Sequence, residues 1–126
     1  MKKMIGFNIA LFALGGCAMQ HGGTASANQV SEWGLYTYGH EVRVFQPCGS
    51  ETEWWAEADK EGVSEALEKA SMAKAEQVGK PYQAVLAKIR HTLPEKATDG
   101  FAESYDAAVT ITAVELIEPN GVCRES

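Results

Sequence analysis

One helical segment separates two groups of strand-like segments, and this order limits the folds open to the chain. A helix is predicted between Gly62 and Gly79, where apolar residues recur at intervals of three and four. Three segments before it and two after it have the alternation or the β-branched and aromatic residues of strands. They are residues 35–38, 41–45, 52–56, 82–93 and 105–117.

The order β-β-β-α-β-β predicts a mainly β domain with one helix. Five short strands, with a helix between the third and fourth, are the order of the OB-fold, a small and partly open barrel. An α+β sheet covered by one helix is the alternative. Near Ala113 the apolar residues of the last segment change phase, from Val109 and Ile111 to Val114 and Leu116. Such a slip predicts a β-bulge or a barrel corner.

The first residues predict export. Lys2 and Lys3 precede a short apolar run followed by small residues, the pattern of a secretory signal peptide. The run is shorter than the roughly 20 residues of a transmembrane helix. It ends in Leu14-Gly15-Gly16-Cys17, which resembles the lipobox of bacterial lipoproteins. The resemblance implies cleavage before Cys17 and its lipidation. Ala18 stands where an aspartate often signals inner-membrane retention, which favours the outer membrane, facing the periplasm.

The chain is therefore expected to have three parts: a lipoprotein signal peptide (1–16), the lipidated cysteine with a polar, flexible tether (17–30), and one small domain (31–126). A core of this size is marginal, so a covalent link would help. Once Cys17 carries lipid, Cys48 and Cys123 remain, and in an oxidising compartment one disulfide is the default. Closing a loop of about 75 residues stabilises the fold by roughly 4 kcal/mol.

The charge excludes some partners. The formal net charge of −6 becomes −8 when Lys2 and Lys3 leave with the signal peptide. An acidic domain repels nucleic acid and anionic membrane surfaces. We therefore expect no nucleic-acid partner, and expect attachment to the membrane through the lipid alone.

A longer series of residues resembles a known family. The series is Gly34-x-Tyr36, Val44-x-x-Pro47-Cys48-Gly49, Trp54 and Phe101-x-x-x-Tyr105-Asp106, ending in Cys123. It resembles a family of small bacterial lipoproteins whose domain is similar to the C-terminal OB-like domain of the NlpE copper-resistance lipoproteins. The resemblance spans nearly all of residues 31–126 and implies a role in sensing or relaying envelope stress. NlpE proteins also carry a CxxC-type pair in an N-terminal domain, and no such pair occurs here.

No pattern of catalytic residues is recognised. The sequence has neither G-x-S-x-G nor a phosphate-binding glycine-rich loop. Glu51 and Glu53 are interpreted as exposed carboxylates rather than an acid–base pair. Met19 and His21 in the tether could hold Cu(I) only weakly, so no metal residue and no cofactor are assigned. We expect a protein that is not an enzyme.

The aromatic residues are the candidates for partner binding, because OB-folds often bind ligands on strand aromatics. Tyr36, Tyr38, Trp54 and Trp55 are the candidates for this role, although burial of most of the aromatic residues in the core is the favoured interpretation. Neighbours on a strand point to opposite faces, so one tryptophan should be largely buried and the other partly exposed. Acidic neighbours such as Glu57 would suit a basic protein partner.

Two hypotheses follow. The first is a non-catalytic, lipid-anchored module of the bacterial cell envelope that binds a protein partner or senses stress. The alternative is a small-ligand or copper-binding lipoprotein that contributes to metal tolerance.

Overall fold

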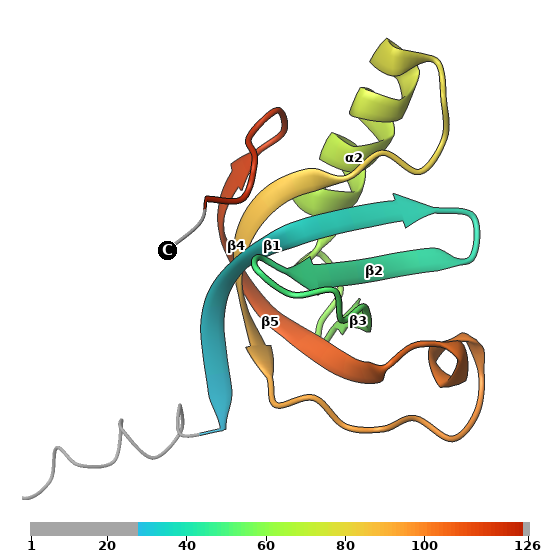
Figure 1. Ribbon diagram of the computed structural model, residues 1–126, viewed down its shortest axis with the longest axis vertical. Coiled ribbons are helices and arrows are strands. Elements are labelled where there is room, and N and C mark those ends of the chain that lie inside the picture. The colour runs from blue at the N-terminus through green and yellow to red at the C-terminus, as the bar shows by residue number, and fades with distance from the viewer. Residues whose placement is uncertain (1–27, 125–126) are drawn as a thin grey trace, which may run out of the picture.

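The computed structural model describes residues 28–124, which form a closed five-stranded barrel with one α-helix (Figure 1). The elements are β1 (Gln29–Gly39), β2 (Val42–Pro47), β3 (Trp54–Ala58), α2 (Glu65–Val78), β4 (Val85–Thr92), the 3-10 helix η2 (Phe101–Ser104) and β5 (Ala107–Glu118). Neighbouring strands follow the order β1-β2-β3-β5-β4, and β4 pairs with β1 to close the barrel. The predicted OB-like barrel is confirmed, and the sheet covered by a helix is not found.

The expected signal peptide, Cys17 and most of the expected tether lie outside the described residues. The barrel itself begins earlier than expected. β1 starts at Gln29, two residues before the predicted domain boundary at 31, because Gln29 pairs with Thr92 and Val30 with His91. Pairing with β4 extends the strand through several polar residues, which have no strand pattern in the sequence.

Alternation decides which side chains fill the barrel. In β4, Val85, Ala87 and Ile89 are completely buried, whereas Lys88 and Arg90 point outward. These inward residues join others from every strand in one core cluster. The faces predicted for this segment are therefore confirmed.

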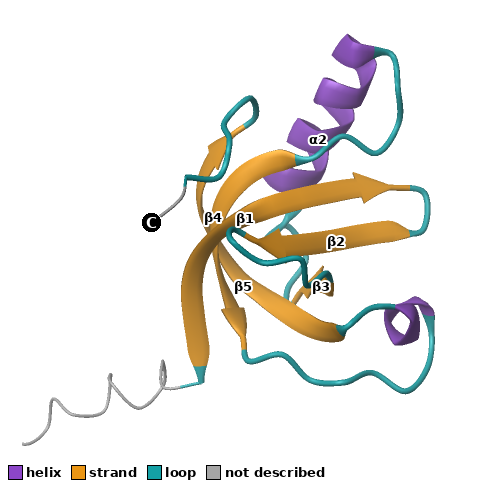
Figure 2. Cartoon of the chain, in the orientation of Figure 1, coloured by secondary structure: helices purple, strands orange, loops and turns teal. Residues whose placement is uncertain are grey.

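The helix α2 covers one end of the barrel, next to β1 and β4 (Figure 2). Its completely buried Leu67 belongs to the core cluster. Ser71 is also completely buried: its hydroxyl accepts the Tyr38 N–H at 3.0 Å and donates to the Gln83 carbonyl at 2.6 Å. The helix ends at Gly79 in a left-handed conformation (φ 82°), which glycine adopts without steric cost. The helix thus links β1 to the segment just before β4 as well as contributing Leu67 to the core.

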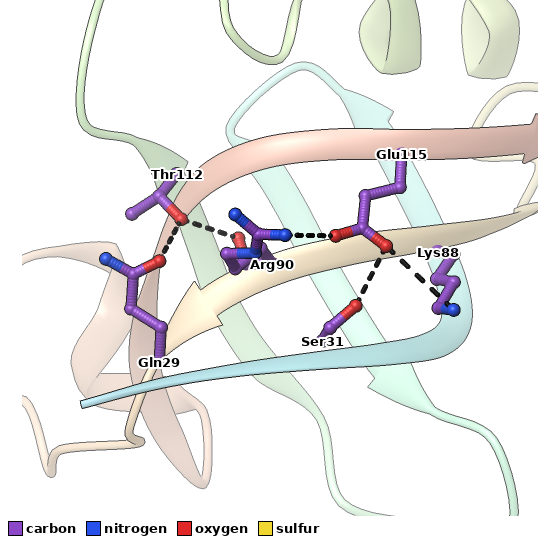
Figure 3. A network of polar contacts seen from close by, with 6 residues as sticks. All are labelled: Gln29, Ser31, Lys88, Arg90, Thr112 and Glu115. Atoms are coloured by element: carbon purple, nitrogen blue, oxygen red, sulfur yellow. Dashed lines mark hydrogen bonds and ion pairs between the residues drawn. The ribbon is translucent and has the colours of Figure 1, made fainter. Parts of the chain in front are cut away.

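β5 contains the predicted irregularity. Its register with β4 shifts twice, so Thr112 and Glu115 have no partner residue across the ladder. Figure 3 shows that both side chains join a polar network on the outer face. Glu115 accepts hydrogen bonds from Ser31 Oγ and Arg90 Nη2, both at 2.9 Å, and Thr112 donates to Gln29 at 2.8 Å. The two bulges thus bend β5 and attach the start of β1 to β4 and β5.

A disulfide links Cys48, after β2, to Cys123, after β5, as predicted. The Cα atoms are 5.4 Å apart, and the two cysteines are separated by 75 residues. This distance lies within the range of about 4.4–6.8 Å usual for disulfides. The bond attaches the C-terminal segment to the turn after β2.

Gly34 should tolerate no side chain. A Cβ there would overlap the Phe45 ring and lie 2.7 Å from the Gln46 carbonyl oxygen. We expect Gly34→Ala to lower the free energy of unfolding by about 1–3 kcal/mol, the usual cost of overpacking. In a Phe45→Leu background the cost should fall, because part of the obstructing ring is removed. An equal cost in both backgrounds, measured by urea unfolding, would contradict this packing.

Loss of the disulfide should destabilise the barrel without changing its interior. Removing a native disulfide from a small secreted domain costs about 2–5 kcal/mol. We expect Cys48→Ala, Cys123→Ala and the double variant to lose similar amounts, because either single change breaks the same bond. Urea unfolding of the three proteins measures this. Single variants as stable as the parent would show that the bond contributes nothing.

Candidate functional site

The two adjacent tryptophans of β3 point to opposite sides of the barrel wall, as the alternation predicts. Trp54 faces inward, with its ring centroid 6.5 Å from that of Phe45 and 5.2 Å from that of His91. Trp55 faces outward but is only 6% exposed, whereas Trp54 is half-buried. One ring is therefore largely buried and the other partly exposed, as expected, but the outer ring is the more buried of the two.

Two aromatic residues from the segment between β4 and β5 cover Trp55. The ring centroids of Phe101 and Tyr105 lie 5.7 Å and 5.6 Å from the indole. Phe101 is itself 53% exposed, and Tyr105 is half-buried. We call Trp55, Phe101 and Tyr105 the aromatic face. Phe101 was not among the expected site residues, although its spacing from Tyr105 in a polar segment was a signal for it.

Two hydrogen bonds to Glu53, the residue before β3, hold the end of this segment in place. The Glu53 N–H donates to the Asp106 carboxylate at 2.8 Å, and the Asp106 N–H donates to the Glu53 carbonyl at 3.0 Å. A further isolated bridge joins Glu95 to Ala108. The segment is therefore anchored at both ends, which fixes η2 and Phe101 above Trp55.

A cleft of about 430 Å³ adjoins the aromatic face. Trp55, Glu57 and Phe101 form one side, and Tyr38 with the β1–β2 turn forms the other. The Arg43 guanidinium lies 5.3 Å from the centroid of the half-buried Tyr38 ring, a cation–π arrangement. The volume of the cleft lies within the range of about 300–1,000 Å³ typical of ligand sites.

Four exposed carboxylates lie in or next to the segments that form the aromatic face. Glu57 accepts a hydrogen bond from the Trp55 indole N–H at 2.5 Å, and Glu57 is exposed. Glu53, Glu103 and Asp106 are also exposed and lie next to or within the segments that carry the three rings. The surface thus combines an exposed aromatic ring with an acidic border.

Tyr36 does not belong to this surface. It lies on the inward phase of β1, opposite Phe45, and is completely buried. Its hydroxyl is the one buried side-chain polar atom without a hydrogen-bond partner among residues 28–124. Burial raises the pKa of Tyr36 far above its ordinary value. The expectation that Tyr36 contacts a partner is therefore wrong for this conformation; Tyr36 is a core residue.

The histidines of the described region have other partners. His91 is completely buried, with Nε2 2.6 Å from the Glu32 carboxylate and Nδ1 2.7 Å from the Thr92 carbonyl oxygen. His40 lies in the β1–β2 turn, with an 86% exposed side chain 3.5 Å from Glu41. Residues 28–124 contain no group of three or more His, Cys, Asp or Glu able to hold a metal ion. Met19 and His21 lie outside this range.

Within residues 28–124 no helix is long and apolar enough to cross a membrane.

Comparison of the chain with protein-family models, curated proteins and solved structures finds no match. The resemblance to NlpE-like lipoproteins therefore rests on the quoted sequence series alone.

Proposed function

We propose that this protein is a non-catalytic, lipid-anchored module of the bacterial cell envelope that binds a basic segment of a protein partner. The proposal depends on the exposure and position of Phe101. Its ring is 53% exposed, yet it is held in a fixed segment above Trp55. Exposed aromatic residues at fixed positions are common anchors of protein interfaces.

The position of the cleft supports binding. OB-folds bind their ligands on the face of strands 2 and 3, between the loop that joins strands 1 and 2 and the loop that joins strands 4 and 5. Here His40 and Glu41 come from the first of these loops and Phe101 from the second, and all three line the cleft. The aromatic face lies at the same edge.

Charge favours a basic partner. The border of the aromatic face carries Glu53, Glu57, Glu103 and Asp106, and the whole chain has a formal charge of −6. Opposite charges increase the rate of encounter and exclude acidic competitors. Raised salt should therefore weaken the interaction.

The proposed location rests on the N-terminal sequence. A lipid on Cys17 would attach the protein to the outer membrane, and the residues between Cys17 and β1 would let the barrel face the periplasm. The resemblance to NlpE-like proteins supports a role in sensing or relaying envelope stress. Copper or small-ligand binding remains the alternative, with Met19 and His21 as its ligands in the tether.

Phe101 should contact the partner directly. With p-benzoylphenylalanine at position 101, we expect irradiation of intact cells to give a discrete cross-linked product that weakens when salt is raised in isolated envelopes. Leu116, which is 52% exposed on β5, is the matched control position and should give none. Phe101→Ala should leave Tm within a few degrees of the parent, because the ring is already half-exposed. Equal cross-linking from both positions would contradict the proposed face.

Cys17 should carry the lipid. Cys17→Ser should abolish metabolic labelling with palmitate and leave an uncleaved precursor, because the modified sulfur is absent. Cys48→Ser, which affects only the disulfide, should still be labelled and processed. Labelling that persists in Cys17→Ser would show that the lipobox interpretation is wrong.

A further inference from the structure

The segment after β5 lines a second cleft. Figure 1 shows this segment on the other side of the barrel from the stretch between β4 and β5. The volume of the cleft is about 380 Å³. Glu32 and Trp33 of β1 form one wall, and Glu118, Val122 and Arg124, at and after the end of β5, form the other. It shares no residue with the cleft beside the aromatic face.

The disulfide and tight packing shape this cleft. Cys48 and Cys123 both line it, and the Cys48 N–H donates to the Trp33 carbonyl at 2.9 Å. The C-terminal wall is thus attached covalently to the turn after β2, and this turn is hydrogen-bonded to β1. Gly121 lies so close to the buried Leu86 that a Cβ would come within 2.8 Å of that side chain. The wall is therefore held at two points.

Two carboxylates and one guanidinium line the cleft. Oε2 of Glu32 lies 2.6 Å from Nε2 of the buried His91 ring, which orients the carboxylate; the Glu32 side chain is still 31% exposed. Glu118 and Arg124 are exposed, and no ion pair within residues 28–124 includes either of them. Within residues 28–124, no ion pair thus competes with a ligand for these two charged groups.

We propose that this cleft binds a basic amino acid, a small molecule with two cationic groups and one carboxylate. The half-buried Trp33 offers an indole to an alkylammonium or guanidinium group, which is attracted to aromatic rings. Glu32 and Glu118 complement the cationic groups, and Arg124 complements the carboxylate through charge-assisted hydrogen bonds. The ligand's aliphatic stem would contact Leu86 and Val122. This site is independent of the proposed protein partner, since it lies on a different surface.

The test is calorimetric titration of the full lipidated chain, in detergent micelles, with L-lysine and L-arginine. We expect both to bind, and Glu118→Gln to weaken binding about tenfold through loss of a charge-assisted hydrogen bond. Glu118 is exposed, so this variant should keep the fold of the parent. Glu76→Gln removes the same charge from the exposed surface of α2 and should leave the affinity unchanged.

Ligand analogues separate the interactions. L-norleucine lacks the side-chain cation and cadaverine lacks the carboxylate, so both should bind more weakly than L-lysine, and L-glutamate should not bind. The NMR signal of the Trp33 indole should shift on adding L-lysine. The proposal is overturned if L-lysine does not bind, if L-glutamate binds equally well, or if the Glu118 and Glu76 variants behave alike.

Discussion

β5 pairs with both β3 and β4, and both candidate sites depend on these two pairings. Its parallel ladder with β3 puts Ala108 beside Trp55, so the segment just before β5 lies over the outer tryptophan. Its antiparallel ladder with β4 pairs Glu118 with Leu86 and carries the C-terminal segment to the disulfide. The start of this strand thus positions the aromatic face, and its end positions the second cleft.

Polar side chains inside the barrel are satisfied by neighbours that also join elements. Ser71 connects α2 to the backbone of residues 38 and 83, and His91 connects β4 to Glu32 of β1. Buried polar groups are costly without such bonds and stabilising with them. The exception within residues 28–124 is the Tyr36 hydroxyl, which is buried without a hydrogen-bond partner on the inward phase of β1.

Strand geometry explains which features could be predicted from the sequence and which could not. Alternation in β4 and the phase slip in β5 predicted inward faces and bulges, because both are local properties of the backbone. Tyr36 was a candidate for partner binding but is buried, because alternation shows which residues share a face, those two positions apart, without showing which face is inside. The exposed, aromatic Phe101 was missed because its neighbour Trp55 is close only in space.

The sequence by itself determined the element order and the helix ending at Gly79, because both follow from local patterns. It also determined the disulfide, because the two cysteines left in the domain can pair in one way only. Only the tertiary structure decided which tryptophan is covered, where Phe101 lies, and that Glu32 and Glu118 line one cleft. Glu32 and Glu118 are far apart in sequence and come together only when β1, β4 and β5 pair. Long-range strand register, which no short pattern encodes, sets such meetings.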